Sequence, residues 1–244
     1  MRTKITINFF IFFVLIFSVP SNAQLFNQLE QAYNIGQITV DEMMLNKIYR
    51  LFDPSKVNTA YVPDLTSVIK CGTEIITEYI NNKNNLSQNS VDIIENYLVI
   101  DEELIGYISP GGHFKLSFTT SGENPVPSDD FDNDGVPDYI ERIANYLDQS
   151  WTVEINNCGF QAPRDVDGDG YYNVYFKSMD AWGYILDLSN GDTKIVLHND
   201  FSNATPTQDL EEGDQMGTAK VTCAHELKHA RSVSENRIEN GEKK

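Results

Sequence analysis

Cysteine is scarce in this chain, which has only Cys71, Cys158 and Cys223 among its 244 residues. An odd number of widely spaced cysteines excludes the multiple-disulfide framework of small secreted scaffolds, so at most one bridge can form. Cys71 with Cys158 is the more plausible pair, because Cys223 falls in a segment whose pattern predicts a helix packed against a core.

Basic residues are also few, with 18 Lys plus Arg against 36 Asp plus Glu and a formal net charge of −18. Such an excess of acid opposes nucleic acid or anionic lipid as partners, because both repel it, and it favours cations. We therefore expect no nucleic-acid partner, and the composition does not indicate the oligomeric state.

Long hydrophobic runs are absent apart from one near the N-terminus. There, Arg2 and Lys4 precede an apolar run over residues 9–17, and small residues of the kind that signal peptidase prefers end at Ala23. The run is too short to cross a bilayer core of about 30 Å. We predict a signal peptide over residues 1–23, a secreted chain and no membrane attachment after cleavage. The processed chain would have 16 basic and 36 acidic residues, a net charge of −20.

Residues 24–108 have the apolar spacing of short helices. Thr39 and Glu42 form a capping-box pattern ahead of one of them. Further short helices are predicted from Glu74 to Asn81 and from Val91 to Leu98. We interpret this region as a helical prodomain or N-terminal lobe.

Residues 109–244 have a different pattern and are predicted to form a second domain. Alternating apolar residues over 114–118 predict a strand with one buried face, and Pro137 suits the first position of a backing helix. A closing helix is expected to start near Thr218. Between these helices we predict three strands, Tyr171 to Phe176, Trp182 to Leu188 and Thr193 to His198. The predicted fold class is α+β.

The closing helix contains the sequence His225-Glu226-Leu227-Lys228-His229, in which two histidines four residues apart project from one helical face. Random placement would give this HExxH pattern with an expectation of roughly 0.004. Two neutral imidazoles can hold zinc, which lowers the pKa of its water to about 7. Glu226 would then be the general base that hydrolyses a peptide bond. The alternative is a pair of exposed histidines on a surface helix. The opposite helical face is apolar, with Cys223, Leu227 and Ala230.

These residues match the motif of the zincin metallopeptidases. More closely, the segments HFKLSFTTSG, DNDGVPDYIE, DVDGDGYYNVYF and AHELKHA together resemble a family of secreted bacterial metallopeptidases that is assigned mostly by motif. The resemblance covers most of the chain after the leader. It implies zinc dependence, peptide-bond hydrolysis, and a zincin-like catalytic domain over residues 109–244 with a mixed sheet, a backing helix and an active-site helix.

The third zinc ligand departs from the zincin pattern. One class takes it from a glutamate about twenty or more residues after the second histidine, whereas only 15 residues follow His229. Another class takes it six residues after that histidine, at Glu235 here, although a helix running straight on would carry Glu235 away from the ion. We therefore expect the domain to be incomplete at its C-terminal end. Cys71 could ligate zinc in a latent form, but a role in the core or in a disulfide is favoured.

Two acidic runs have the spacing of calcium loops. In the first, every side-chain position is filled and Gly135 stands at the tight turn, so a divalent cation would relieve the repulsion between crowded acids. Pro137 argues against a paired EF-hand. The alternative is a solvated acidic turn. The predicted ligands of this first loop are Asp130, Asp132, Asp134, the carbonyl of Val136, Asp138 and Glu141.

The second run offers Asp165, Asp167, Asp169 and Asn173 at equivalent positions, but Phe176 stands where the bidentate carboxylate is needed. Calcium binding is less strongly indicated here than in the first loop.

Two functional hypotheses follow. The first is a secreted, calcium-stabilised zinc metallopeptidase that acts on a peptide or protein substrate. The second is a non-catalytic extracellular calcium-binding protein in which the HExxH segment is a relic.

Overall fold

The computed structural model describes residues 25–100, 104–164, 168–187 and 193–239, with side chains up to Glu235. The predicted signal peptide lies outside the described residues. No helix in the described part of the chain combines the length and apolar character needed to cross a membrane.

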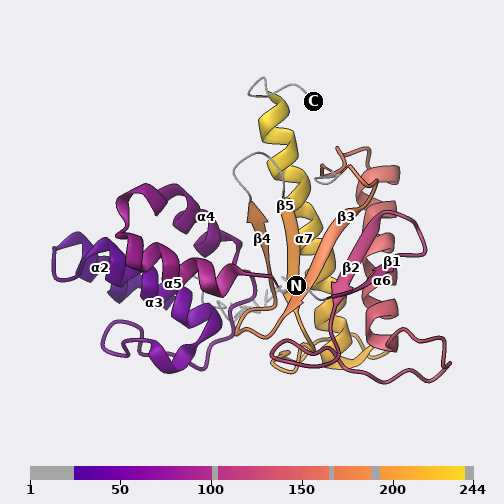
Figure 1. Ribbon diagram of the computed structural model, residues 1–244, viewed down its shortest axis with the longest axis horizontal. Coiled ribbons are helices and arrows are strands. Elements are labelled where there is room, and N and C mark those ends of the chain that lie inside the picture. The colour runs from indigo at the N-terminus through magenta and orange to yellow at the C-terminus, as the bar shows by residue number, and fades with distance from the viewer. Residues whose placement is uncertain (1–24, 101–103, 165–167, 188–192, 240–244) are drawn as a thin grey trace, which may run out of the picture.

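The N-terminal lobe, residues 25–100, is helical and lies beside one edge of a sheet (Figure 1). Thr39 caps its second helix as predicted, because its hydroxyl accepts from the backbone N–H of Glu42 while the Glu42 carboxylate accepts from the Thr39 N–H. The lobe contains α2 (Asn27–Asn34), α3 (Val40–Phe52), η1 (Pro54–Lys56), α4 (Thr73–Asn82), η2 (Lys83–Asn85) and α5 (Gln88–Leu98).

The sheet is mixed and has five strands among the described residues, in the order β1-β2-β3-β5-β4. The central strands β2, β3 and β5 run parallel, while β1 and β4 are antiparallel edge strands. All three predicted strands after residue 170 are present, but β1 was not predicted and begins before residue 109. The strands are β1 (Ile105–Ile108), β2 (Phe114–Phe118), β3 (Tyr172–Lys177), β4 (Gly183–Asp187) and β5 (Thr193–His198).

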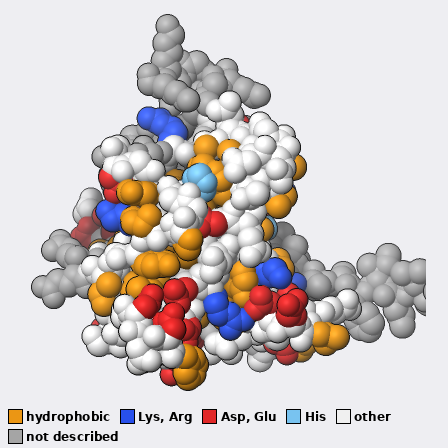
Figure 2. All heavy atoms as spheres, turned by 90° about the vertical axis from the view of Figure 1, so that its right-hand side faces the viewer, with side chains coloured by type: hydrophobic (Ala, Val, Ile, Leu, Met, Phe, Trp, Pro, Cys, Tyr) orange, Lys and Arg blue, Asp and Glu red, His pale blue; other side chains and the backbone are white. Residues whose placement is uncertain are grey.

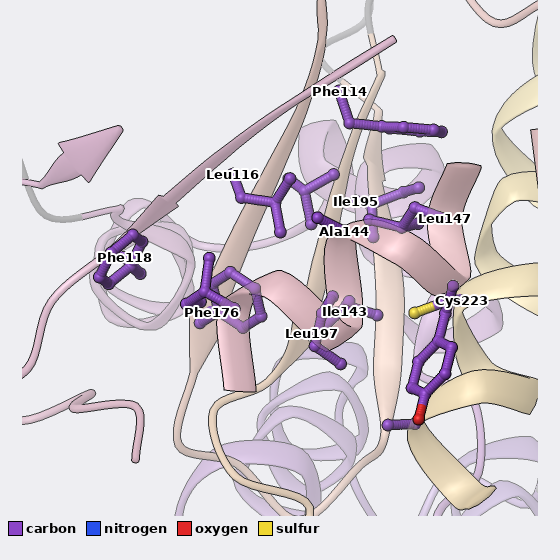
Figure 3. Close-up of a cluster of buried hydrophobic side chains, with 14 of the residues drawn as sticks. Phe114, Leu116, Phe118, Ile143, Ala144, Leu147, Phe176, Ile195, Leu197 and Cys223 are labelled. Atoms are coloured by element: carbon purple, nitrogen blue, oxygen red, sulfur yellow. The ribbon is translucent and has the colours of Figure 1, made fainter. Parts of the chain in front are cut away.

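Two helices, α6 (Asp138–Trp151) and α7 (Gly213–Glu239), cover one face of the sheet. The backing helix is present, but Pro137 is its extended N-cap, one residue before the first helical position predicted for it. A π-helical turn, η3 (Thr152–Asn157), follows α6. The helix α7 begins five residues before the predicted Thr218. The core between these layers is built largely from aromatic and branched side chains, among them Phe114, Leu116, Phe176, Ile143, Leu147, Ile195 and Cys223 (Figure 3).

The opposite face of β4 and β5 packs against the N-terminal lobe. Alternation along a strand sends neighbouring side chains to opposite faces. Ile185 therefore joins the core under α6 and α7, whereas Tyr184 joins the core of the N-terminal lobe with Leu51. In β5, Val196 does the same. The lobe and the sheet thus share one buried interface, and β4 lies between the lobe and α7.

Candidate metal centre

The helix α7 places both histidines of the HExxH motif at one point on its surface. The Nε2 atoms of His225 and His229 lie 3.0 Å apart, and their rings meet edge to face. On the other side of the helix, Cys223, Leu227 and Ala230 are fully buried, as the sequence pattern predicted. Burial of the apolar face fixes the rotation of α7 about its axis. The histidines therefore face the edge of the sheet formed by β4.

Cys71 from the N-terminal lobe completes this cluster. Its Sγ atom lies 3.6 Å from His229 Nε2, and the ligand atoms of Cys71, His225 and His229 are mutually close enough to share one ion. Tetrahedral zinc with ordinary bond lengths requires about 3.3 Å between two imidazole nitrogens and about 3.6 Å between a nitrogen and a thiolate sulfur. The three donors therefore suit zinc in type. The separation of Cys71 Sγ from His229 Nε2 matches a tetrahedral site, and the two imidazole nitrogens lie slightly closer together than in one.

Cys71 reaches the histidines because the segment Ile69–Thr73 runs along the outer edge of β4. The N–H of Trp182 donates to the carbonyl of Ile69 at 3.1 Å, and the N–H of Gly72 donates to the carbonyl of Gly183 at 2.8 Å. A parallel bridge joins Ile69 and Ala181. The segment is thus an added strand-like element on the sheet.

Glu226 is fully buried beside the two histidines. The Thr73 hydroxyl donates to its Oε2 at 3.2 Å, while Oε1 is buried with no hydrogen-bond partner among the described residues. Burial raises the pKa of Glu226 to about 8, an effect that the neighbouring Cys71 thiol and the Thr73 hydroxyl partly oppose. A buried carboxylate with a raised pKa is a suitable proton acceptor for a group entering the site.

Burial also favours the neutral forms of the possible metal ligands. It lowers the pKa of His229 to about 4, with a further contribution from His225, and it lowers the pKa of His225. Burial and the nearby Glu226 raise the pKa of the Cys71 thiol to about 12. Neutral imidazoles are the form that binds metals, whereas the thiol must lose its proton when it becomes a ligand.

Two residues of this site, Thr73 and Gly183, were not identified from the sequence. A Cβ atom at Gly183 would lie 3.0 Å from Glu226 Cγ and 3.1 Å from Thr222 Cγ2, so glycine allows β4 to approach α7 closely. Thr73 connects both elements, since its Oγ1 also accepts from the N–H of Ile185. Neither Thr73 nor Gly183 is part of a recognisable sequence motif, so only their positions in the folded structure identify them as site residues.

Glu235 is not among the residues that the described part of the chain brings together with the histidines. The helix α7 continues past His229, and Glu235 forms an ion pair with Arg231, with 3.3 Å between Glu235 Oε1 and Arg231 Nη1. Glu235 is therefore not placed as the third ligand that the metzincin spacing suggested.

The predicted disulfide between Cys71 and Cys158 is wrong. All three cysteines are thiols. Cys71 is directed to His229, whereas Cys158 is exposed at the end of the π-helical turn that follows α6.

The first acidic loop brings its predicted residues together in two overlapping groups, Asp130 with Asp132 and Asp134, and Asp132 with Asp138 and Glu141. Backbone N–H groups hold these carboxylates, for example Gly135 N donating to Asp130 Oδ2 at 3.0 Å. Partial burial and the four neighbouring aspartates raise the pKa of Glu141. Figure 2 shows acidic side chains gathered low on the face of the molecule that carries α6.

The remaining predicted ligand of that loop, the carbonyl of Val136, follows the turn at Gly135, whose φ is +94°. Such a left-handed backbone is adopted readily by glycine, which explains its position in the loop. The residues have oxygen donors only, as calcium prefers.

The second acidic run is only partly described, because Asp165 and Asp167 lie outside the described residues. Asp169 forms an ion pair with Lys115, with 3.0 Å between Oδ2 and Nζ, and Asn173 is buried within β3. Among the described residues, these two do not belong to a cluster that could hold a metal.

Comparison of the chain with protein-family models, with curated proteins and with solved structures finds no significant match, so the geometry above is the basis for assigning a function.

Proposed function

We propose that this chain is a secreted zinc metallopeptidase that hydrolyses peptide bonds. The observation that carries the proposal is the placement of His225 and His229 with their Nε2 atoms 3.0 Å apart, directly beside the buried carboxylate of Glu226. Two further features support it: the mixed sheet ends in the antiparallel edge strand β4, and this strand packs against α7 at the motif.

His225 and His229 would hold the ion, and the chain would supply the proton transfers. Zinc at such a site polarises a carbonyl group and lowers the pKa of a bound water to about 7. Glu226 accepts the proton of the attacking water and returns it to the leaving amine. Burial of Glu226 serves both steps, because a carboxyl group with a raised pKa can accept a proton and donate it again near neutral pH.

We propose calcium as a second cofactor, bound by the loop from Asp130 to Glu141. The two overlapping carboxylate groups support this, since five like charges close together are stabilised by a divalent cation. The loop leads directly into α6, so an ion there would fix the start of the backing helix. The role is structural, which suits a secreted protein exposed to other proteases.

Metal analysis tests the zinc assignment. The purified chain without its leader is dialysed against trace-metal-free calcium buffer, and wild type is compared with His225→Ala and His229→Ala. We expect about one zinc per chain in wild type, in line with a single HExxH site, and its loss in both variants.

Hydrolysis of casein or of a peptide library is then measured with Glu226→Gln as the matched control, which keeps both histidines. We expect zinc to remain in this variant and hydrolysis to be lost. Retention of calcium with no zinc in wild type would contradict the peptidase assignment and favour the non-catalytic calcium-binding protein.

A further inference from the structure

The third donor of the metal cluster comes from a part of the chain outside the HExxH motif. We infer that Cys71 is the third protein ligand of the metal, and that the segment Ile69–Thr73 holds the site in a closed form. This inference rests on the proposed zinc site. It adds to that site a specific ligand and a means of regulation by the N-terminal lobe.

Distances and chemistry both favour Cys71 as a ligand. Its sulfur lies 3.6 Å from His229 Nε2, the separation that two ligands of one tetrahedral zinc ion have. Cysteine and histidine are the donors that zinc prefers in proteins. The other thiols are placed differently, because Cys223 is buried on the far side of α7 and Cys158 is exposed beyond α6.

The segment that carries Cys71 occupies the edge of β4. An extended peptide binds a sheet edge by adding a strand through main-chain hydrogen bonds. Here the carbonyl of Ile69 accepts from Trp182, directly before β4, at 3.1 Å, and the N–H of Gly72 donates to Gly183 in β4 at 2.8 Å. A peptide substrate that used this edge beside Glu226 would have to displace the segment.

The N-terminal lobe is firmly attached to the sheet behind this segment. The fully buried guanidinium of Arg50 forms an ion pair with Asp180 just before β4 and also donates to the carbonyl of Ser67. The N–H of Asp180 donates to the carbonyl of Leu51 at 2.7 Å. These contacts hold the chain on the N-terminal side of Cys71 against the sheet. Opening the site therefore requires displacement of the segment Ile69–Thr73, which a bond between Cys71 and the metal would oppose.

Cobalt spectroscopy tests the ligand directly. The full chain without its leader is freed of metal and titrated with Co²⁺, which gives a thiolate-to-metal charge-transfer absorption only when sulfur is bound. We expect this absorption in wild type and in the matched variant Cys158→Ser, and its loss in Cys71→Ser. The affinity of Cys71→Ser for cobalt should fall at least roughly tenfold, the lower bound for losing an outer-shell partner.

The outcomes separate the two proposals. Cobalt bound in wild type without a thiolate absorption, or an unchanged absorption in Cys71→Ser, overturns the role of Cys71 and leaves the histidine site intact. No cobalt bound in wild type overturns the zinc site and this inference together.

Peptide hydrolysis, expressed per bound zinc, tests the closing role. We expect Cys71→Ser to hydrolyse a peptide at least roughly tenfold faster than wild type and Cys158→Ser, because a site that is rarely open binds substrate correspondingly more weakly. The double variant Cys71→Ser, Glu226→Gln should lose this activity. Equal or slower hydrolysis by Cys71→Ser would overturn the closing role.

Discussion

The two clusters of candidate metal ligands in this protein are assembled in opposite ways. The acidic loop draws its ligands from residues 130–141, and local turns bring them together. The histidine cluster joins α7 to Cys71, which is 158 residues away from His229 in the sequence. One site therefore depends on a short segment, and the other depends on the docking of the N-terminal lobe against the sheet.

Because of this difference, substitutions in the N-terminal lobe and in the acidic loop should affect different sites. Loosening the N-terminal lobe should move Cys71 away from His229 while leaving the acidic loop unchanged, because the lobe contributes none of that loop's ligands. Damage to the acidic loop should affect α6 first. Variants at each place can therefore show whether the two sites are independent.

The largest effect is expected at the ion pair that anchors the lobe. Asp180→Ala would remove the carboxylate that is paired with the buried guanidinium of Arg50 and leave it only the attraction of Asp64. Removing one partner of a buried pair costs about 3–5 kcal/mol, and we expect the lower end because the Asp180 side chain is 30% exposed. Urea unfolding of the metal-free chain measures this loss. The cobalt–thiolate absorption should fall as well, while calcium affinity stays unchanged.

Lys83→Ala is the control for that experiment. It breaks the exposed ion pair between Lys83 and Glu95 within the same lobe. Exposed pairs contribute about 0–1 kcal/mol, so stability and the thiolate absorption should hardly change. A loss of calcium binding in Asp180→Ala would show that the two sites are coupled. It would contradict the conclusion that the acidic loop is independent of the N-terminal lobe.

The next largest effect is expected from calcium. At a concentration 100 times its dissociation constant, a bound ion stabilises the folded chain by about 2.7 kcal/mol. Asp132 belongs to both carboxylate groups of the loop, so Asp132→Asn should remove most of this gain.

Asp129→Asn is the matched control, because the described carboxylate groups do not include Asp129. Thermal unfolding with calcium and with chelator measures both. Equal calcium responses in the two variants would mean that the loop does not bind the ion.

Most of the fold could be predicted from the sequence where the signal is local. The capping box at Thr39, the helix after Pro137 and the strands after residue 170 follow from spacing within a few residues. The strand β1 was missed because its pattern is weak, with exposed Ile105 and Ile108 on the sheet edge. Edge strands bury little, so apolar alternation does not mark them.

Of the candidate metal site, only the part on α7 could be predicted from the sequence. The spacing of His225 and His229 places them on one face of a helix, and the structure has them there. The position of Cys71 depends on how the N-terminal lobe docks on β4, which no local pattern encodes. The predicted disulfide with Cys158 failed for the same reason, since pairing cysteines from sequence alone ignores the distance between them in the fold.

The smallest effect is expected at the close contact between β4 and α7. Gly183→Ala would place a Cβ atom 3.0 Å from Glu226 Cγ and 3.2 Å from its Oε1, so the carboxylate must shift. Overpacking costs about 1–3 kcal/mol, and we expect about 1 kcal/mol because the Glu226 side chain can yield. Gly106→Ala in β1 is the control, since nothing lies within 4 Å of a Cβ there. Zinc should stay bound in both variants, because neither touches the histidines, whereas peptide hydrolysis should fall only in Gly183→Ala. Full hydrolysis in Gly183→Ala, measured per bound zinc, would show that the position of Glu226 against β4 does not matter for the chemistry.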